Sequence, residues 1–265
     1  MKLFCRKYGS GPPLIILHGL YGSSDNWVQI ARKAGEYYTC YLPDQRNHGR
    51  SPHSNEHNYD VMRDDLEELV EDLNLDRFFL AGHSMGGKTA IKYAISHPGK
   101  LYGLLITDIS PFAGEDNYRT SYNLHLQILN AILNTDISRL PGRSEVDSEL
   151  SVSIRSERIR GFIMKNLQRT TDNKFEWKIN ARALLDNLDR IMEGISRPVN
   201  NVHQITGFPV VFLRGELSDY LPGKDLSDIQ KIFPAAELIE VKQAGHWIHA
   251  DRPDEVIKSL LSLRG

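Results

Sequence analysis

Cysteine is scarce in this chain, which has only two in 265 residues, Cys5 and Cys40. Both fall in short segments typical of strands, and neither has the spacing of a metal ligand. A disulfide framework is therefore not expected, and we interpret both residues as reduced, structural thiols. We expect no metal and no organic cofactor.

The chain also lacks an excess of charge of one sign and any long apolar run. Lysine and arginine total 32 against 34 acidic residues, a formal net charge of -2, which argues against a broad basic face for nucleic acid. No apolar run approaches the roughly 20 residues of a membrane span. The segment from Met1 to Lys7 has charges on both sides of a very short apolar stretch, unlike a signal peptide. We expect a cytoplasmic monomer or homodimer with a small-molecule substrate, no nucleic-acid partner and no membrane span.

Alternating strand and helix patterns are what the chain does contain. Short apolar runs typical of strands occur at 14–17, 37–42, 78–81 and 104–107, and helical patterns separate them, most clearly at 59–73. Near-continuous apolar strands alternating with helices indicate a parallel sheet that is covered on both faces. The fold class predicted is α/β, with a doubly wound, mostly parallel sheet.

The pattern changes after Pro111. Polar helical segments follow, among them 124–133 and 157–167, and strand-like material returns only at 209–213, before a helix at 226–233, a strand at 238–241 and a helix at 253–263. We predict that residues 1–111 and 206–265 form the core and that residues 112–205 form an inserted helical cap. Such a cap would cover the carboxyl edge of the sheet, where open α/β sheets bind ligands.

The central chemical signal is Gly82-His83-Ser84-Met85-Gly86-Gly87, between a predicted strand and a predicted helix. This strand-turn-helix context is that of a nucleophile elbow. The turn is so tight that Cβ atoms at Gly82 and Gly86 would clash with the neighbouring strand and helix. Ser84 is thereby placed with its hydroxyl exposed at a helix N-terminus, and we predict that it is a nucleophile.

A serine nucleophile needs a base, and ten histidines are available. His246 follows the last predicted strand and precedes the last helix, which is the expected position in chain order. His249 is the rival, but it lies deeper toward the terminal helix. We predict His246 as general base and interpret His249 as a packing or capping residue.

An oxyanion hole requires two preorganised backbone N–H groups. One is expected at Met85, the residue after the nucleophile. The other should come from the loop His18-Gly19-Leu20-Tyr21-Gly22-Ser23 after the first long strand, and we assign it to Leu20.

With these motifs placed, the chain resembles the α/β-hydrolase family and, more closely, the bacterial YbfF-type esterases and their mitochondrial relatives. The segments that carry the resemblance are the loop 18–23 with Asp25-Asn26-Trp27, Asp44-Gln45-Arg46-Asn47-His48-Gly49-Arg50-Ser51, the elbow 82–87, Asp108-Ile109-Ser110-Pro111, and Ala244-Gly245-His246-Trp247-Ile248-His249-Ala250. The resemblance implies an α/β-hydrolase fold with a catalytic triad. It also implies that the segment 44–51 ties a loop beside the site rather than acting chemically.

Two aspartates compete as triad acid. Most of the family has the acid after the strand that follows the cap, where this chain has Ser218, with Asp219 one position late. YbfF-type esterases instead have it after the preceding strand, in a context that matches Asp108. We favour Asp108 and keep Asp219 as the alternative.

Five residues are expected to contact substrate. The stretch from Phe175 to Asn180 resembles one that borders the pocket in this subfamily, and aromatic residues near the motifs are candidate walls. The five are Tyr21, Trp177, Asn180, Tyr220 and Trp247.

These observations predict a serine carboxylesterase or thioesterase that cleaves short to medium acyl esters, or acyl thioesters such as acyl-CoA, through an acyl-enzyme on Ser84. The alternatives are another enzyme of the same fold, such as a cofactor-free haloperoxidase, a lyase or a carbon-carbon hydrolase, and a non-catalytic ligand-binding member. Dehalogenases and epoxide hydrolases are disfavoured because they use aspartate where Ser84 stands.

Overall fold

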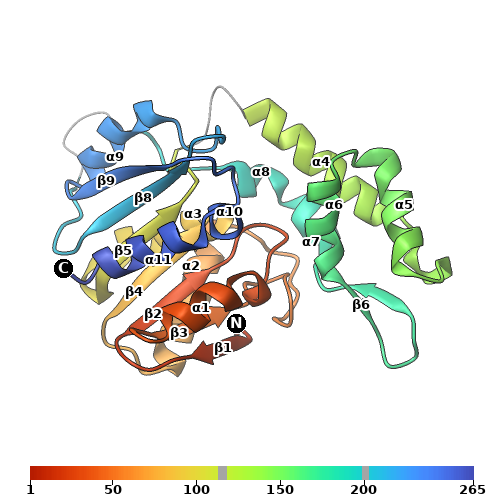
Figure 1. The fold of residues 1–265 in the computed structure, drawn as a ribbon, viewed down its shortest axis with the longest axis horizontal. Coiled ribbons are helices and arrows are strands. Elements are labelled where there is room, and N and C mark those ends of the chain that lie inside the picture. Colours follow the sequence, from red (N-terminus) through yellow and green to blue (C-terminus); the bar gives the residue numbers. More distant parts are fainter. Residues whose placement is uncertain (113–117, 199–202) are drawn as a thin grey trace.

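A seven-stranded sheet forms the centre of the molecule, of which a computed structural model describes residues 1–112, 118–198 and 203–265 (Figure 1). The strand order is β1-β3-β2-β4-β5-β8-β9. Within the described residues β1 pairs antiparallel with β3 and all other pairs in this sheet are parallel. The strands are β1 Cys5–Tyr8, β2 Pro13–Leu17, β3 Thr39–Pro43, β4 Phe78–His83, β5 Leu101–Thr107, β8 Val210–Gly215 and β9 Ala236–Val241. The predicted α/β class with a mostly parallel sheet is confirmed.

Alternate residues of β2 pack on opposite faces of the sheet, as the two-residue period of a strand requires. Ile15 and Leu17 join the cluster with α2, α3 and α9, whereas Leu14 and Ile16 join the cluster with α1 and α11. These helices span Val28–Ala34 (α1), Tyr59–Asp72 (α2), Met85–Ser96 (α3), Leu226–Ile232 (α9) and Pro253–Ser262 (α11). Helices therefore cover both faces, and the carboxyl edge of the sheet is left for the site.

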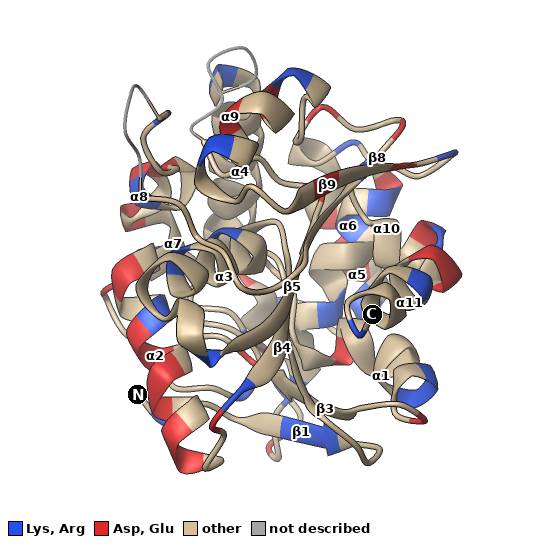
Figure 2. Ribbon diagram, turned by 90° about the vertical axis from the view of Figure 1, so that its left-hand side faces the viewer, with Lys and Arg blue, Asp and Glu red and all other residues tan. Residues whose placement is uncertain are grey.

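Charged residues lie mainly on the helices and loops. Figure 2 shows β4 and β5 free of them, while acidic residues recur along α2. All six residues of β4 are buried, which explains why this strand reads as one continuous apolar run ending in Gly82 and His83.

The chain between β5 and β8 projects from one end of the sheet (Figure 1). Its described elements are α4 Tyr118–Asn134, α5 Arg143–Ser153, α6 Glu157–Ile163, α7 Ala181–Asp186, α8 Leu188–Met192 and the antiparallel hairpin of β6 Leu167–Arg169 and β7 Phe175–Trp177. They share an apolar cluster of their own, to which the core contributes Leu20, Tyr21, Tyr59, Met62 and Met85. We call this segment the cap. The predicted range 112–205 also includes residues 113–117 and 199–202, which lie outside the described residues.

Several elements differ from the sequence-based expectation. The helix expected at 157–167 ends at Ile163 and continues as a 3-10 turn, Met164–Asn166, and then as strand β6. The segment around Cys5, expected to be strand-like, is strand β1, whereas the β6–β7 hairpin was not expected, because strands of three residues with charged side chains give no apolar run. A short helix, α10 Ile248–Asp251, and four further 3-10 turns, Ser24–Trp27, Pro98–Lys100, Ile137–Arg139 and Gly223–Asp225, complete the described elements.

Candidate active site

Ser84 occupies a strained turn between β4 and α3. Its φ of 52° and ψ of -118° are unusual for a residue with a side chain. A Cβ at Gly82 would lie 2.3 Å from the Gly86 carbonyl oxygen, and one at Gly86 would lie 2.5 Å from the His18 carbonyl oxygen. Only glycine fits either position. The expected clash is confirmed, and it is what brings the strand and helix close enough to present Ser84.

His246, which is partly exposed, pairs with the buried Asp108 at the carboxyl edge of the sheet. His246 lies between β9 and α10, and its Nδ1 is 2.8 Å from Asp108 Oδ2. Asp108 is fully buried directly after β5, with a positive φ of 51°. An imidazole that donates from Nδ1 to this carboxylate presents Nε2 as a base.

Two further donors hold the Asp108 carboxylate. The Gly215 N–H donates to Oδ1 at 2.9 Å, and the Ser218 hydroxyl donates to Oδ2. Ser218 stands at the position where most of the family has the triad acid. In this chain its hydroxyl binds Asp108, which follows the preceding strand, β5. Asp219, the alternative acid, lines the cavity that Ser84 and His246 also line.

Aromatic rings fix the His246 imidazole. The Tyr220 ring is stacked on it with centroids 3.9 Å apart, and the His83 ring lies at 4.7 Å. His83 Nε2 also donates to the His246 carbonyl oxygen at 2.8 Å. Burial lowers the pKa of His83 well below its usual value, so this neighbour is neutral and adds no charge beside the base.

His249, the rival base, is packed in the interior. Its ring is stacked on Trp27 with centroids 4.6 Å apart, and burial lowers its pKa to about 3. This placement agrees with the interpretation of His249 as a packing residue.

Leu20 and Met85 line the same cavity as Ser84 and His246. The loop that carries Leu20 approaches the elbow closely, since a Cβ at Gly19 would lie 3.2 Å from Ser84 Cβ. Tyr21, the next residue, has a positive φ of 61°. The arrangement suits the predicted oxyanion hole, in which backbone N–H groups from both segments converge.

Two neutral histidines support this loop. His48 Nε2 accepts the Tyr21 N–H at 3.2 Å, and its Nδ1 donates to the Arg46 carbonyl oxygen. His18 Nε2 accepts the Gln45 N–H at 2.9 Å. Burial lowers the pKa of both imidazoles, which keeps each able to accept. The segment 44–51 therefore ties the loop, as the resemblance implies.

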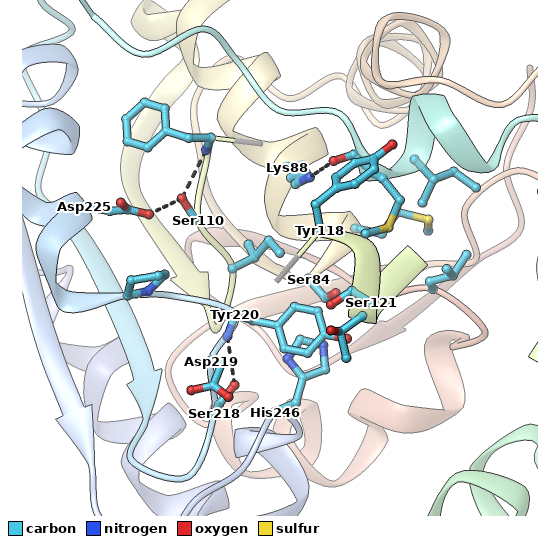
Figure 3. A pocket seen from close by; sticks show the side chains of 18 of the residues that line it. Ser84, Lys88, Ser110, Tyr118, Ser121, Ser218, Asp219, Tyr220, Asp225 and His246 are labelled. Carbon is cyan, nitrogen blue, oxygen red and sulfur yellow. Dashed lines mark hydrogen bonds between the residues drawn. The ribbon is translucent and has the colours of Figure 1, made fainter. Parts of the chain in front are cut away.

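A cavity of about 370 Å³ lies between core and cap above these residues (Figure 3). The core contributes Ser84, Met85, Leu20 and His246, and the cap contributes Tyr118, Ser121, His125 and Ile191 among others. Tyr220 also lines it, as expected of a substrate contact.

The other four residues expected to contact substrate are not among the described residues that line this cavity, and they contact other residues of the protein. Tyr21 Oη lies 3.2 Å from His125 Nδ1, and Asn180 donates to Asn47 Oδ1 at 3.1 Å. Trp177 is on β7 in the cap cluster, and the Trp247 ring lies 5.2 Å from that of Phe162. Their contact with substrate stays a prediction.

Sequence reasoning missed Lys88 and Tyr59, which both line the cavity. Lys88 follows Ser84 by four residues on a helix, and this spacing places both side chains on one side of it. The sequence therefore contained a signal that Lys88 lies near the nucleophile. Tyr59 gave none.

Neither a metal site nor a membrane span is found in the part of the chain that the structure describes. There, no three histidine, cysteine, aspartate or glutamate side chains are grouped to bind a metal ion, and no helix has the length and apolar character to cross a bilayer.

Comparison with known proteins agrees with this geometry. A model of the alpha/beta hydrolase fold family matches residues 12–253. The chain belongs to the α/β-hydrolase fold family. The resemblance seen in the motifs is thereby confirmed, and the elbow is this family's feature.

Relatives within the α/β-hydrolase family carry lipase and esterase names. The chain is 33% identical to the sn-1-specific diacylglycerol lipase ABHD11 of Danio rerio, over 96% of this chain and 78% of the relative. It is 27% identical to the esterase YbfF of Escherichia coli (strain K12), over 94% and 91% of the two chains. A solved structure described as a marine microorganism esterase superimposes with a TM-score of 0.93 at 42% identity, covering 99% of each chain. The chain is a hydrolase of the esterase class.

Proposed function

We propose that this α/β-hydrolase cleaves carboxylic esters by two-step acyl transfer, with Ser84 as nucleophile, His246 as base and Asp108 as acid. The observation that carries the proposal is the 2.8 Å contact between His246 Nδ1 and the buried Asp108 carboxylate, in a cavity that Ser84 and His246 both line. A carboxylate, an imidazole and a serine at an elbow are the three parts of a triad.

The first step forms the acyl-enzyme. His246 Nε2 takes the Ser84 hydroxyl proton as Oγ attacks the ester carbonyl carbon, and the N–H groups of Leu20 and Met85 stabilise the oxyanion. The tetrahedral intermediate then collapses, the bond to the alcohol oxygen breaks, and His246 returns the proton to that oxygen. Asp108 stabilises the imidazolium throughout, because its carboxylate is already held by Gly215 and Ser218.

The second step releases the acid. Water loses a proton to His246 and attacks the acyl carbonyl carbon, and the new intermediate expels Ser84 Oγ, which recovers its proton from the imidazole. Atoms balance as one ester and one water giving one alcohol and one acid.

The volume of the cavity supports short to medium acyl groups. About 370 Å³ is near the lower end of the roughly 300–1,000 Å³ of small-molecule sites. Thioesters such as acyl-CoA use the same two steps and remain part of the proposal, with the leaving group outside the cavity.

A fluorophosphonate probe with a turnover assay tests this function. Wild type should be labelled and should hydrolyse 4-nitrophenyl butyrate, whereas Ser84→Ala should do neither. Ser96→Ala, at the exposed end of the same helix, is the matched control and should retain both. Full turnover by folded Ser84→Ala would overturn the proposal. Labelling of wild type without turnover of any ester would favour the alternative chemistries of this fold.

A further inference from the structure

Lys88 brings a positive charge into the cavity beside Ser84. Lys88 lies one turn further along α3, where its backbone N–H donates to the Ser84 carbonyl oxygen at 3.0 Å. Four residues of helix advance by about 6 Å, so both side chains leave the same side of α3. Figure 3 shows Lys88 and Ser84 among the side chains that line one cavity.

In the described part of the chain, the groups that contact the Lys88 ammonium group are neutral. Its Nζ donates to the carbonyl oxygens of Met192, at 3.1 Å, and Glu193. The Tyr59 ring centroid is 5.7 Å away. Within 1–112, 118–198 and 203–265, no carboxylate oxygen lies within 4.0 Å of this nitrogen. Burial lowers the pKa of Lys88 to about 8, and the Glu193 charge opposes that shift.

Among the described residues, two groups accept hydrogen bonds from the Lys88 ammonium group, which leaves one of its N–H groups for a ligand. An ammonium group has three donors, and the two carbonyl oxygens account for two of them. A partly buried charge without a counter-ion is costly, and an anion that enters the cavity relieves that cost. Hydroxyl and imidazole groups of Tyr118, Ser121 and His125 line the same cavity. The cavity wall that Lys88 shares therefore includes polar groups as well as apolar side chains.

We propose that Lys88 is a subsite for a carboxylate at the far end of the acyl group, which makes half esters of short dicarboxylic acids the preferred substrates. The inference rests on the proposed ester hydrolysis and specifies its acyl group. With the carbonyl carbon at Ser84 Oγ, an acyl chain of four to six carbons extends along α3 toward Lys88 Nζ. The carboxylate takes the remaining N–H in a charge-assisted hydrogen bond.

A purely structural role for Lys88 would be to anchor the cap. Its two carbonyl partners belong to the end of α8, and Tyr59 binds the same end, because its hydroxyl donates to the Ile191 carbonyl oxygen at 2.6 Å. Tyr59→Phe therefore removes an anchor of α8 without removing a charge. It is the matched control for Lys88→Met.

The experiment measures kcat/KM for ethyl half esters of succinate, glutarate and adipate against ethyl butanoate, pentanoate and hexanoate. The charge preference is the kcat/KM of the half ester divided by the kcat/KM of the neutral ester with the same number of acyl carbons. We expect a preference of about tenfold or more in wild type, its loss in Lys88→Met, and its retention in Lys88→Arg and Tyr59→Phe.

The inference is overturned if wild type shows no charge preference, if Lys88→Met keeps it, or if Tyr59→Phe loses it to the same degree. Should Lys88→Met fail to fold, competitive inhibition of wild type decides. Glutaramate, which has an amide at one end and a carboxylate at the other, should inhibit hydrolysis of a neutral ester about tenfold more strongly than pentanamide, and equal inhibition overturns the subsite. Hydrolysis of neutral esters with labelling of Ser84 supports the proposed function in every case, so the two failures are distinguishable.

Discussion

The side-chain amide of Asn166 in the cap donates to the backbone carbonyl oxygen of Tyr21 at 2.8 Å. Tyr21 also donates its N–H to His48 at 3.2 Å, so both backbone groups of this positive-φ residue are bound. Tyr21 follows Leu20, the proposed oxyanion donor. The cap therefore contacts the loop proposed to form the oxyanion hole, in addition to lining the cavity.

Asn166→Ala should lower kcat by roughly tenfold to a hundredfold with a much smaller change in KM, because the loop loses one of its ties and small misplacement of catalytic groups is costly. Binding of a boronic acid, which mimics the tetrahedral intermediate, should weaken in parallel. Asn187→Ala is the matched control, since the Asn187 amide joins the cap to Asn55 at 2.8 Å, away from this loop. Equal losses in both variants would contradict a specific role for Asn166.

Asp108→Asn should reduce turnover far more than Asp219→Asn. An amide in place of the carboxylate presents a donor to His246 Nδ1 and favours the wrong tautomer, a change that costs about ten-thousandfold in a related triad. Steady-state kinetics of the two variants decide the matter, and the reverse ranking would transfer the role of acid to Asp219.

Acid should destabilise the fold steeply. Burial lowers the pKa of His57 and His249 to about 3 and that of His125 to about 4. Between these values and about 6.5 the unfolded chain binds protons that the folded chain does not, so the free energy of unfolding falls as pH falls. Each such histidine contributes a slope of about 1.4 kcal/mol per pH unit.

Urea unfolding at pH 7, 6 and 5 measures that slope. His57→Gln should reduce this slope by the contribution of about one proton, whereas Gly99→Ala, which removes no titratable group, should leave the slope unchanged. A slope near zero over this range in wild type would show that the buried histidines do not control acid stability.

Gly86→Ala should destabilise the protein by about 2 kcal/mol or more and reduce Ser84 labelling, because its Cβ would meet backbone atoms that cannot move aside. Gly99→Ala is the control, as a Cβ there meets no atom within 4 Å. Thermal unfolding compares the two. Similar melting temperatures would contradict the steric account of the elbow.

The sequence by itself determined the fold class and located two candidate residues, Ser84 and His246. The reason is that their signals are local. The elbow requires glycines at Gly82 and Gly86 within one contiguous strand-turn-helix segment, and His246 is placed by its order after the last strand. Apolar runs likewise located the central strands, because a strand buried on both faces has few polar positions.

Only the tertiary structure decided which aspartate lies against His246. Asp108 and Asp219 follow adjacent strands at the same edge, and the choice depends on which loop brings an oxygen within 2.8 Å of Nδ1. That distance is set by packing between residues 138 positions apart, and no local pattern encodes it. The same holds for Lys88, whose sequence neighbours show a helix and whose exposure to the cavity depends on where the cap places α8.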